Sequence, residues 1–125
     1  MVFRPTMAAD GPSEDHSTRL SYHRYETSKG LALWTVYGKF DSPEAAKAEL
    51  EYRAGTAVKI VVNGWQLDAK GDILGRRVEA LLPSSAPTNR SVFAVMWTAD
   101  RYFHEIHSNC KEAVLYAEKN ARERN

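Results

Sequence analysis

The stretch SVFAVMWTADRYFHEIH, residues 91–107, decides the fold. Its first run, Val92 to Trp97, is apolar at every position, so a strand here presents apolar side chains to both faces of a sheet. The polar link TADR separates this run from YFHEIH at residues 102–107. Two such runs joined by a short polar link predict a β-hairpin within a mainly antiparallel sheet.

Further apolar and aromatic runs predict more strands. RLSYHRYE (19–26) and LALWTVYGKF (31–40) flank the turn TSKG and predict another hairpin. TAVKIVVNGWQLD (56–68) also has the composition of a strand. The run ILGRRVEALL, Ile73 to Leu82, fits either a strand or a helix, and we favour a strand because Gly75 would weaken a short helix.

Two segments have the marks of helices. In DSPEAAKAELEYRAG (41–55), Ser42 fits the N-cap, Pro43 fits the first helical position and Gly55 fits the stop. In SNCKEAVLYAEKNARER (108–124), Asn109 and Glu112 stand at capping-box spacing. The pattern predicts an α+β fold, a two-layer sandwich in which a mainly antiparallel sheet of about five to six strands carries both helices on one face.

The length of 125 residues suits one domain with one core. Residues 1–18 mix proline, glycine and charged residues without periodicity, which is typical of a flexible leader. We therefore expect residues 19–125 to form a single α+β domain.

Composition excludes or disfavours several classes of protein. The net charge of +1 gives no basic excess, so a nucleic-acid partner is not favoured. The single cysteine excludes an internal disulfide and a cysteine-rich zinc site. The sequence has no apolar run of membrane-spanning length, no apolar core of a secretory signal and no phosphate or dinucleotide motif. We expect a cytoplasmic protein with no membrane partner, no cofactor and no metal site.

If both helices cover one face of the sheet, its other face needs a different cover. An exposed apolar sheet face usually marks an interface or a ligand groove. This favours a non-catalytic binding or interaction module acting through a sheet face, with a possible homodimer or an unknown small-molecule or protein partner. The candidate binding residues are Trp34, Tyr37, Trp97, Tyr102 and His104.

Two alternatives remain open. Alternation along a strand places Glu105 and His107 on one face and His104 on the other, so the Glu105/His107 pair could serve as the acid–base pair of a small hydrolase or isomerase. Cys110 is a further catalytic candidate at the start of a helix, although it also fits the apolar stripe of that helix. The second alternative is a single-stranded nucleic-acid binder that stacks bases on the aromatic side chains of the sheet.

Overall fold

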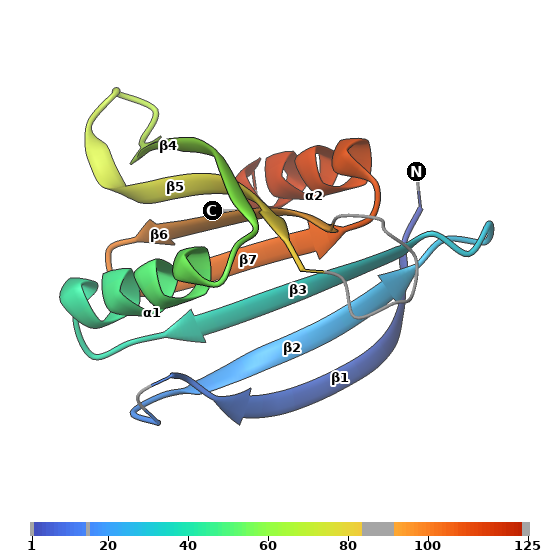
Figure 1. Ribbon diagram of the computed structural model, residues 1–125, viewed down its shortest axis with the longest axis horizontal. Helices are drawn as coiled ribbons and strands as arrows, with labels where there is room; N and C mark the ends of the chain where they lie inside the picture. Colours follow the sequence, from blue (N-terminus) through green and yellow to red (C-terminus); the bar gives the residue numbers. More distant parts are fainter. Residues whose placement is uncertain (1, 15, 84–91, 124–125) are drawn as a thin grey trace.

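The computed structural model describes residues 2–14, 16–83 and 92–123, which form one seven-stranded antiparallel sheet and two α-helices (Figure 1). Across the sheet the strands follow the order β1-β2-β3-β7-β6-β5-β4. The predicted α+β class is confirmed, with seven strands where the sequence predicted five to six. The elements are β1 (Arg4–Pro12), β2 (Arg19–Glu26), β3 (Ala32–Lys39), α1 (Pro43–Gly55), β4 (Lys59–Leu67), β5 (Ile73–Leu82), β6 (Val92–Ala99), β7 (Tyr102–Ser108) and α2 (Lys111–Glu123).

The two helices pack on opposite faces of the sheet, which corrects the expectation that both lie on one face. Ala94 and Met96 of β6 belong to the core cluster that includes buried residues of α1. Val95 and Trp97 belong to the cluster that includes buried residues of α2. A strand that is apolar on both sides needs a cover on both sides, and one helix supplies each. The two sides are called the α1 face and the α2 face below.

Residues 4–12, which the sequence assigned to a flexible leader, form the edge strand β1 and pair antiparallel with β2. Most side chains of β1 are exposed, so the strand lacks the apolar alternation that would have revealed it. Pro5 and Pro12 are compatible with this position because an edge strand leaves some N–H groups without a ladder partner. Ile73–Leu82 is strand β5, as we favoured over a helix.

The helix starts show how the local sequence sets the element boundaries. The Ser42 hydroxyl accepts a hydrogen bond from the Ala45 N–H at 3.1 Å, and Pro43 opens α1 as predicted. The second helix begins at Lys111, and the Cys110 carbonyl accepts from the Val114 N–H. Cys110, rather than the expected Asn109, therefore stands at the position before the helix.

Gly75 lies where β5 passes close to β6. A Cβ atom built on Gly75 would overlap the backbone carbonyl of Thr98, a neighbour that cannot rotate away. The Thr98 hydroxyl also accepts from the Arg76 N–H at 3.0 Å, which fixes the two strands together.

We expect Gly75→Ala to lower the free energy of unfolding by about 1–3 kcal/mol, because a fixed carbonyl must shift to admit the methyl group. Gly55→Ala, at the end of α1, is the control, since a Cβ there would meet no atom within 4 Å apart from the helix's own backbone. Urea denaturation of both variants measures the difference. Equal midpoints for the two variants would contradict the close approach of β5 and β6 at this point.

Candidate functional site

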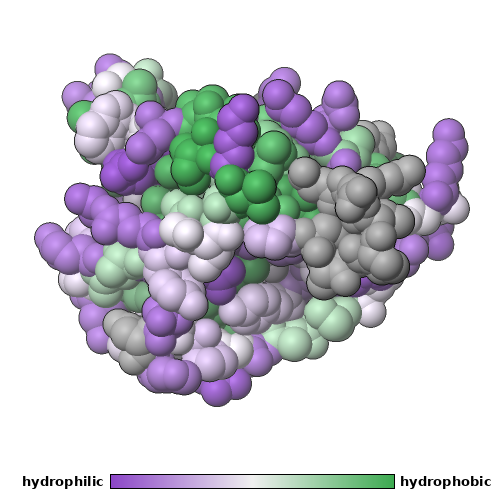
Figure 2. All heavy atoms as spheres, in the orientation of Figure 1, coloured by the Kyte–Doolittle hydropathy of each residue, from purple (hydrophilic) through white to green (hydrophobic). Residues whose placement is uncertain are grey.

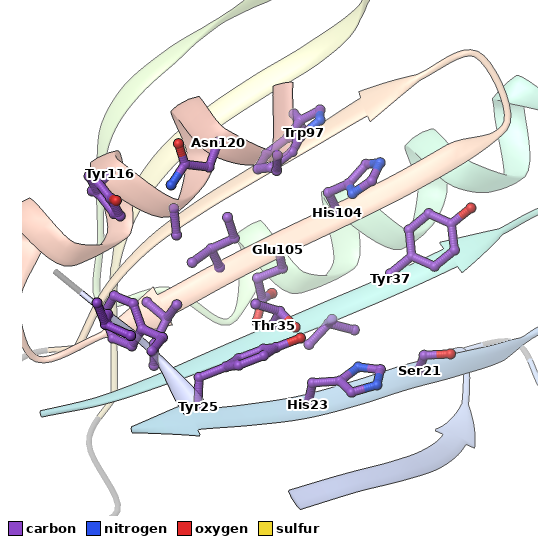
Figure 3. A pocket seen from close by; sticks show the side chains of 17 residues that line it. Ser21, His23, Tyr25, Thr35, Tyr37, Trp97, His104, Glu105, Tyr116 and Asn120 are labelled. Carbon is purple, nitrogen blue, oxygen red and sulfur yellow. The ribbon is translucent and has the colours of Figure 1, made fainter. Parts of the chain in front are cut away.

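A pocket of about 640 Å³ opens on the α2 face, between α2 and the strands beside it (Figure 3). Strands β2, β3, β6 and β7 form its floor, and α2 with Val2 and Phe3 contributes to its walls. This is called the α2-face pocket below. The side chains that bring polar groups to it are Ser21, His23, Tyr25, Thr35, Tyr37, His104, Tyr116 and Asn120.

Strand register builds the floor of this pocket. Trp97 of β6 stands opposite His104 of β7, and His104 stands opposite Tyr37 of β3. These three side chains form a row across the sheet, called the aromatic row below, which ends opposite Ser21 of β2. The rings of Trp97 and His104 stack with centroids 4.7 Å apart and planes 8° apart. The ring of Tyr37 is tilted against His104 at 5.0 Å.

The aromatic row is uncharged near neutral pH. Burial lowers the pKa of His104 to about 4, because its charged form would lose water without gaining a counter-ion. Burial also raises the pKa of Tyr37, and nearby Tyr102 adds to that effect. His104 is therefore a neutral imidazole with one donor and one acceptor nitrogen, and Tyr37 keeps its phenolic proton.

The structure brings together four of the five predicted binding residues. Tyr37, Trp97 and His104 make the aromatic row, and Tyr102 stacks on Tyr37 with ring centroids 6.1 Å apart. Trp34 lies on the opposite face, where its ring stacks on His107 at 5.6 Å. The reason is alternation, since residues 34 and 37 are an odd number of positions apart on one strand.

Several pocket residues were missed by sequence reasoning. His23 and Tyr25 share a face of β2, a pattern visible in RLSYHRYE, but only the pairing of β2 with β3 places them beside the aromatic row. Tyr116 and Asn120 come from α2. They could not be assigned to the pocket without knowing which face of the sheet α2 covers.

The pair Glu105 and His107 lies on the α1 face. The Nδ1 atom of His107 is 2.9 Å from Oε2 of Glu105, so the two side chains meet as strand alternation predicts. The guanidinium group of Arg53 in α1 is 3.4 Å from Oε1 of Glu105. It also donates to Glu49 at 2.7 Å and to the Tyr22 hydroxyl at 2.9 Å. These five residues are called the Arg53 network.

The Glu105 carboxylate is buried, with 3% of the residue exposed. Burial alone would raise its pKa, but the hydrogen bond and charge of His107 and the charge of Arg53 outweigh burial, so the pKa is lowered. The carboxylate is therefore ionised at neutral pH and fully engaged within the protein. This arrangement stabilises the contact between α1 and β7.

The three catalytic candidates do not converge on one cleft. Among the described residues, His107 lines neither the α2-face pocket nor either of two smaller pockets, of about 540 and 250 Å³. Glu105 borders the α2-face pocket, but its carboxylate is held on the α1 face by Arg53 and His107. Cys110 packs with the core cluster on the α2 face, and its thiol contacts Glu112 at 3.5 Å.

The described part of the chain shows no sign of a metal centre or of a membrane-spanning helix. Among its histidine, cysteine, aspartate and glutamate residues, no group of three or more is placed to hold a metal ion. Neither described helix combines the length and the apolar character that crossing a membrane requires.

Comparison of the chain with protein-family models, with curated proteins and with solved structures finds no match.

Proposed function

We propose that the chain is a non-catalytic binding protein that holds an uncharged small molecule with a flat ring in the α2-face pocket. The aromatic row supports this function most directly. Tyr37, which is 40% exposed, offers a neutral ring on which a flat ligand can stack, and its neighbour His104 is stacked on the buried ring of Trp97. The pocket volume of about 640 Å³ lies within the range that small-molecule sites occupy.

The polar groups that line the pocket also indicate which functional groups the ligand carries. The hydroxyl groups of Ser21, Tyr25 and Thr35 and the amide of Asn120 can both donate and accept hydrogen bonds. Among the described residues that line the pocket, Glu105 is the only acidic one and no lysine or arginine occurs. A charged ligand would lose its water in this pocket without gaining an opposite charge, so a neutral ring with both donors and acceptors is favoured.

The alternatives receive less support. A single-stranded nucleic acid would bring phosphates to a pocket whose described lining residues include no lysine or arginine. The 2.9 Å contact of Glu105 with His107 favours the hydrolase or isomerase alternative. However, Glu105 also forms an ion pair with Arg53, so a structural role is enough to explain this contact. A cytoplasmic location and a homodimer also remain predictions.

We expect Tyr37→Ala to weaken binding of neutral ring compounds about five- to tenfold, which is the stacking contribution of one aromatic ring. Indole and benzamide serve as neutral probes, and benzoate and benzylamine serve as charged counterparts. Titrations followed by ¹H–¹⁵N spectra of the protein measure each affinity.

Tyr52→Ala is the matched control for this titration. Tyr52 is a tyrosine of α1 with 49% of its surface exposed, against 40% for Tyr37. The control should bind the neutral probes like the wild type. Equal binding by both variants, or preferred binding of the charged probes, would count against the proposed site.

A further inference from the structure

The outer edge of the sheet at β4 is apolar and has no neighbouring strand in the described part of the chain. β4 is the last strand in the sheet order and pairs only with β5. Figure 2 shows apolar side chains gathered over this region. The exposed large apolar residues there are Val58, Ile60, Val61, Val62, Trp65 and Leu67.

The opposite edge of the sheet is protected, and the β4 edge is not. β1 carries Pro5 and Pro12 near its ends and Asp10 within it. Prolines and charges are the usual means by which an edge strand avoids pairing with another chain. Residues 60–67, IVVNGWQL, contain neither a proline nor a charged residue. An edge of this kind is a template for strand addition.

We propose that β4 pairs with β4 of a second copy of this chain, antiparallel, about a two-fold axis at Gly64. The interface would continue the sheet from one copy into the other. It involves neither the α2-face pocket nor the Arg53 network, so it is independent of the proposed ligand site.

The register follows from the requirement that residues opposite each other point to the same face of the sheet. Counting outward from Gly64, Asn63 stands opposite Trp65 of the second copy, and Val62 stands opposite Gln66.

Val61 is the extra residue of the bulge between Ile60 and Val62 in the pairing of β4 with β5. If Val61 is left out of the count, Ile60 stands opposite Leu67 of the second copy. Both residues are apolar, and both then point to the same face of the sheet.

The same count places Lys59 opposite Asp68 of the second copy, and the two-fold axis repeats this pair at the other end. Without the bulge, these two residues would point to opposite faces. The edge is therefore complementary to itself in charge at both ends and uncharged between them. This self-complementarity identifies a second copy, rather than an unrelated protein, as the partner.

The variant Gly64→Cys tests the register directly, in a background where Cys110→Ser removes the native thiol. At the axis, the introduced thiol of each copy would lie opposite its counterpart, with Cβ atoms about 4.5–5.5 Å apart, close enough for a disulfide after a small adjustment. The new side chain has room, because its Cβ would meet only the Arg77 carbonyl at 3.9 Å.

We expect Gly64→Cys to form a disulfide-linked dimer under mild oxidation, seen on a non-reducing gel. Asn63→Cys is the control, because Asn63 faces Trp65 of the second copy and not itself. Sedimentation velocity of the untagged wild type should show a dimer. A wild-type monomer at about 100 µM, or equal cross-linking of both cysteine variants, would overturn the proposal. Circular dichroism confirms that each variant is folded.

The charge pair gives a second, independent measurement. Lys59→Asp places two aspartates opposite each other at each end, and we expect the dimer to dissociate about tenfold more readily. Adding Asp68→Asn should restore part of the affinity. Asparagine keeps the side-chain oxygen that accepts from the N–H groups of Lys70 and Asp72. Lys29→Asp, in an exposed turn, is the control, and an unchanged dissociation constant for Lys59→Asp would refute this register.

Discussion

Replacing Arg53 by methionine is expected to lower the free energy of unfolding by about 3–5 kcal/mol, the largest effect among these variants. Methionine keeps much of the side-chain length and removes the charge. Glu105 and Glu49 are 3% and 4% exposed, and both form ion pairs with Arg53. Without the guanidinium group, two buried carboxylates would lie near each other with His107 as the remaining partner of Glu105. Removing one member of a buried ion pair costs more than the pair itself contributes.

Urea denaturation at pH 7 measures this loss, and Lys47→Met is the matched control on the same helix. Lys47 pairs with Glu51 at 3.8 Å, but both side chains are more than half exposed, so the control should change stability by less than about 0.5 kcal/mol. The double variant Arg53→Met with Glu105→Gln should be more stable than the sum of the single changes predicts. A loss for Arg53→Met no larger than that of the control would mean that the network does not stabilise the fold.

The pH dependence of this loss follows from the lowered pKa of Glu105. A carboxyl whose pKa is lower in the folded state stabilises the protein above its unfolded pKa, and this stabilisation is lost as the pH falls through the folded pKa. Without Arg53, burial would weigh more heavily and favour the protonated acid. The difference in stability between the wild type and Arg53→Met should therefore narrow as the pH falls from 7 towards 4.

The central hairpin could be predicted from the sequence because its information is local. Alternation along 102–107 correctly separates His104 from Glu105 and His107. The same rule separates Trp34 from Tyr37, so only one of the two could share a face with His104. The Ser-Pro start of α1 is equally local, which is why its boundary agrees with the structure.

The placement of the helices and the pocket depends on information that is not local. The apolar residues of β6 require a cover on each face of the sheet, but the neighbouring sequence does not indicate which helix covers which face. The pocket also depends on the pairing of β3 with β7, two strands with residues 40–101 between them. Strand β1 escaped detection because its side chains are exposed and it is held to β2 by backbone pairing.

Acidification from pH 7 to pH 5 is expected to remove about 2 kcal/mol of stability through His104 alone. The pKa of His104 is about 4 in the folded protein and 6.5 without its surroundings, because burial disfavours the charged ring. A histidine with a lowered pKa binds its proton more readily in the unfolded chain. Its contribution to stability is therefore complete above pH 6.5 and is lost progressively as the pH falls towards 4.

His104→Phe tests this assignment, because phenylalanine can still stack on Trp97 but does not titrate. Urea denaturation at pH 7, 6 and 5 measures the free energy of unfolding of both proteins. This free energy should fall less steeply with pH for His104→Phe than for the wild type. By pH 5 the wild type should have lost about 2 kcal/mol more than the variant. The acid response of Glu105 is present in both proteins and cancels in this comparison. Parallel pH profiles for His104→Phe and the wild type would show that burial does not keep the imidazole of His104 neutral. In that case the floor of the pocket would carry a charge, and it would not suit the uncharged ligand that we propose.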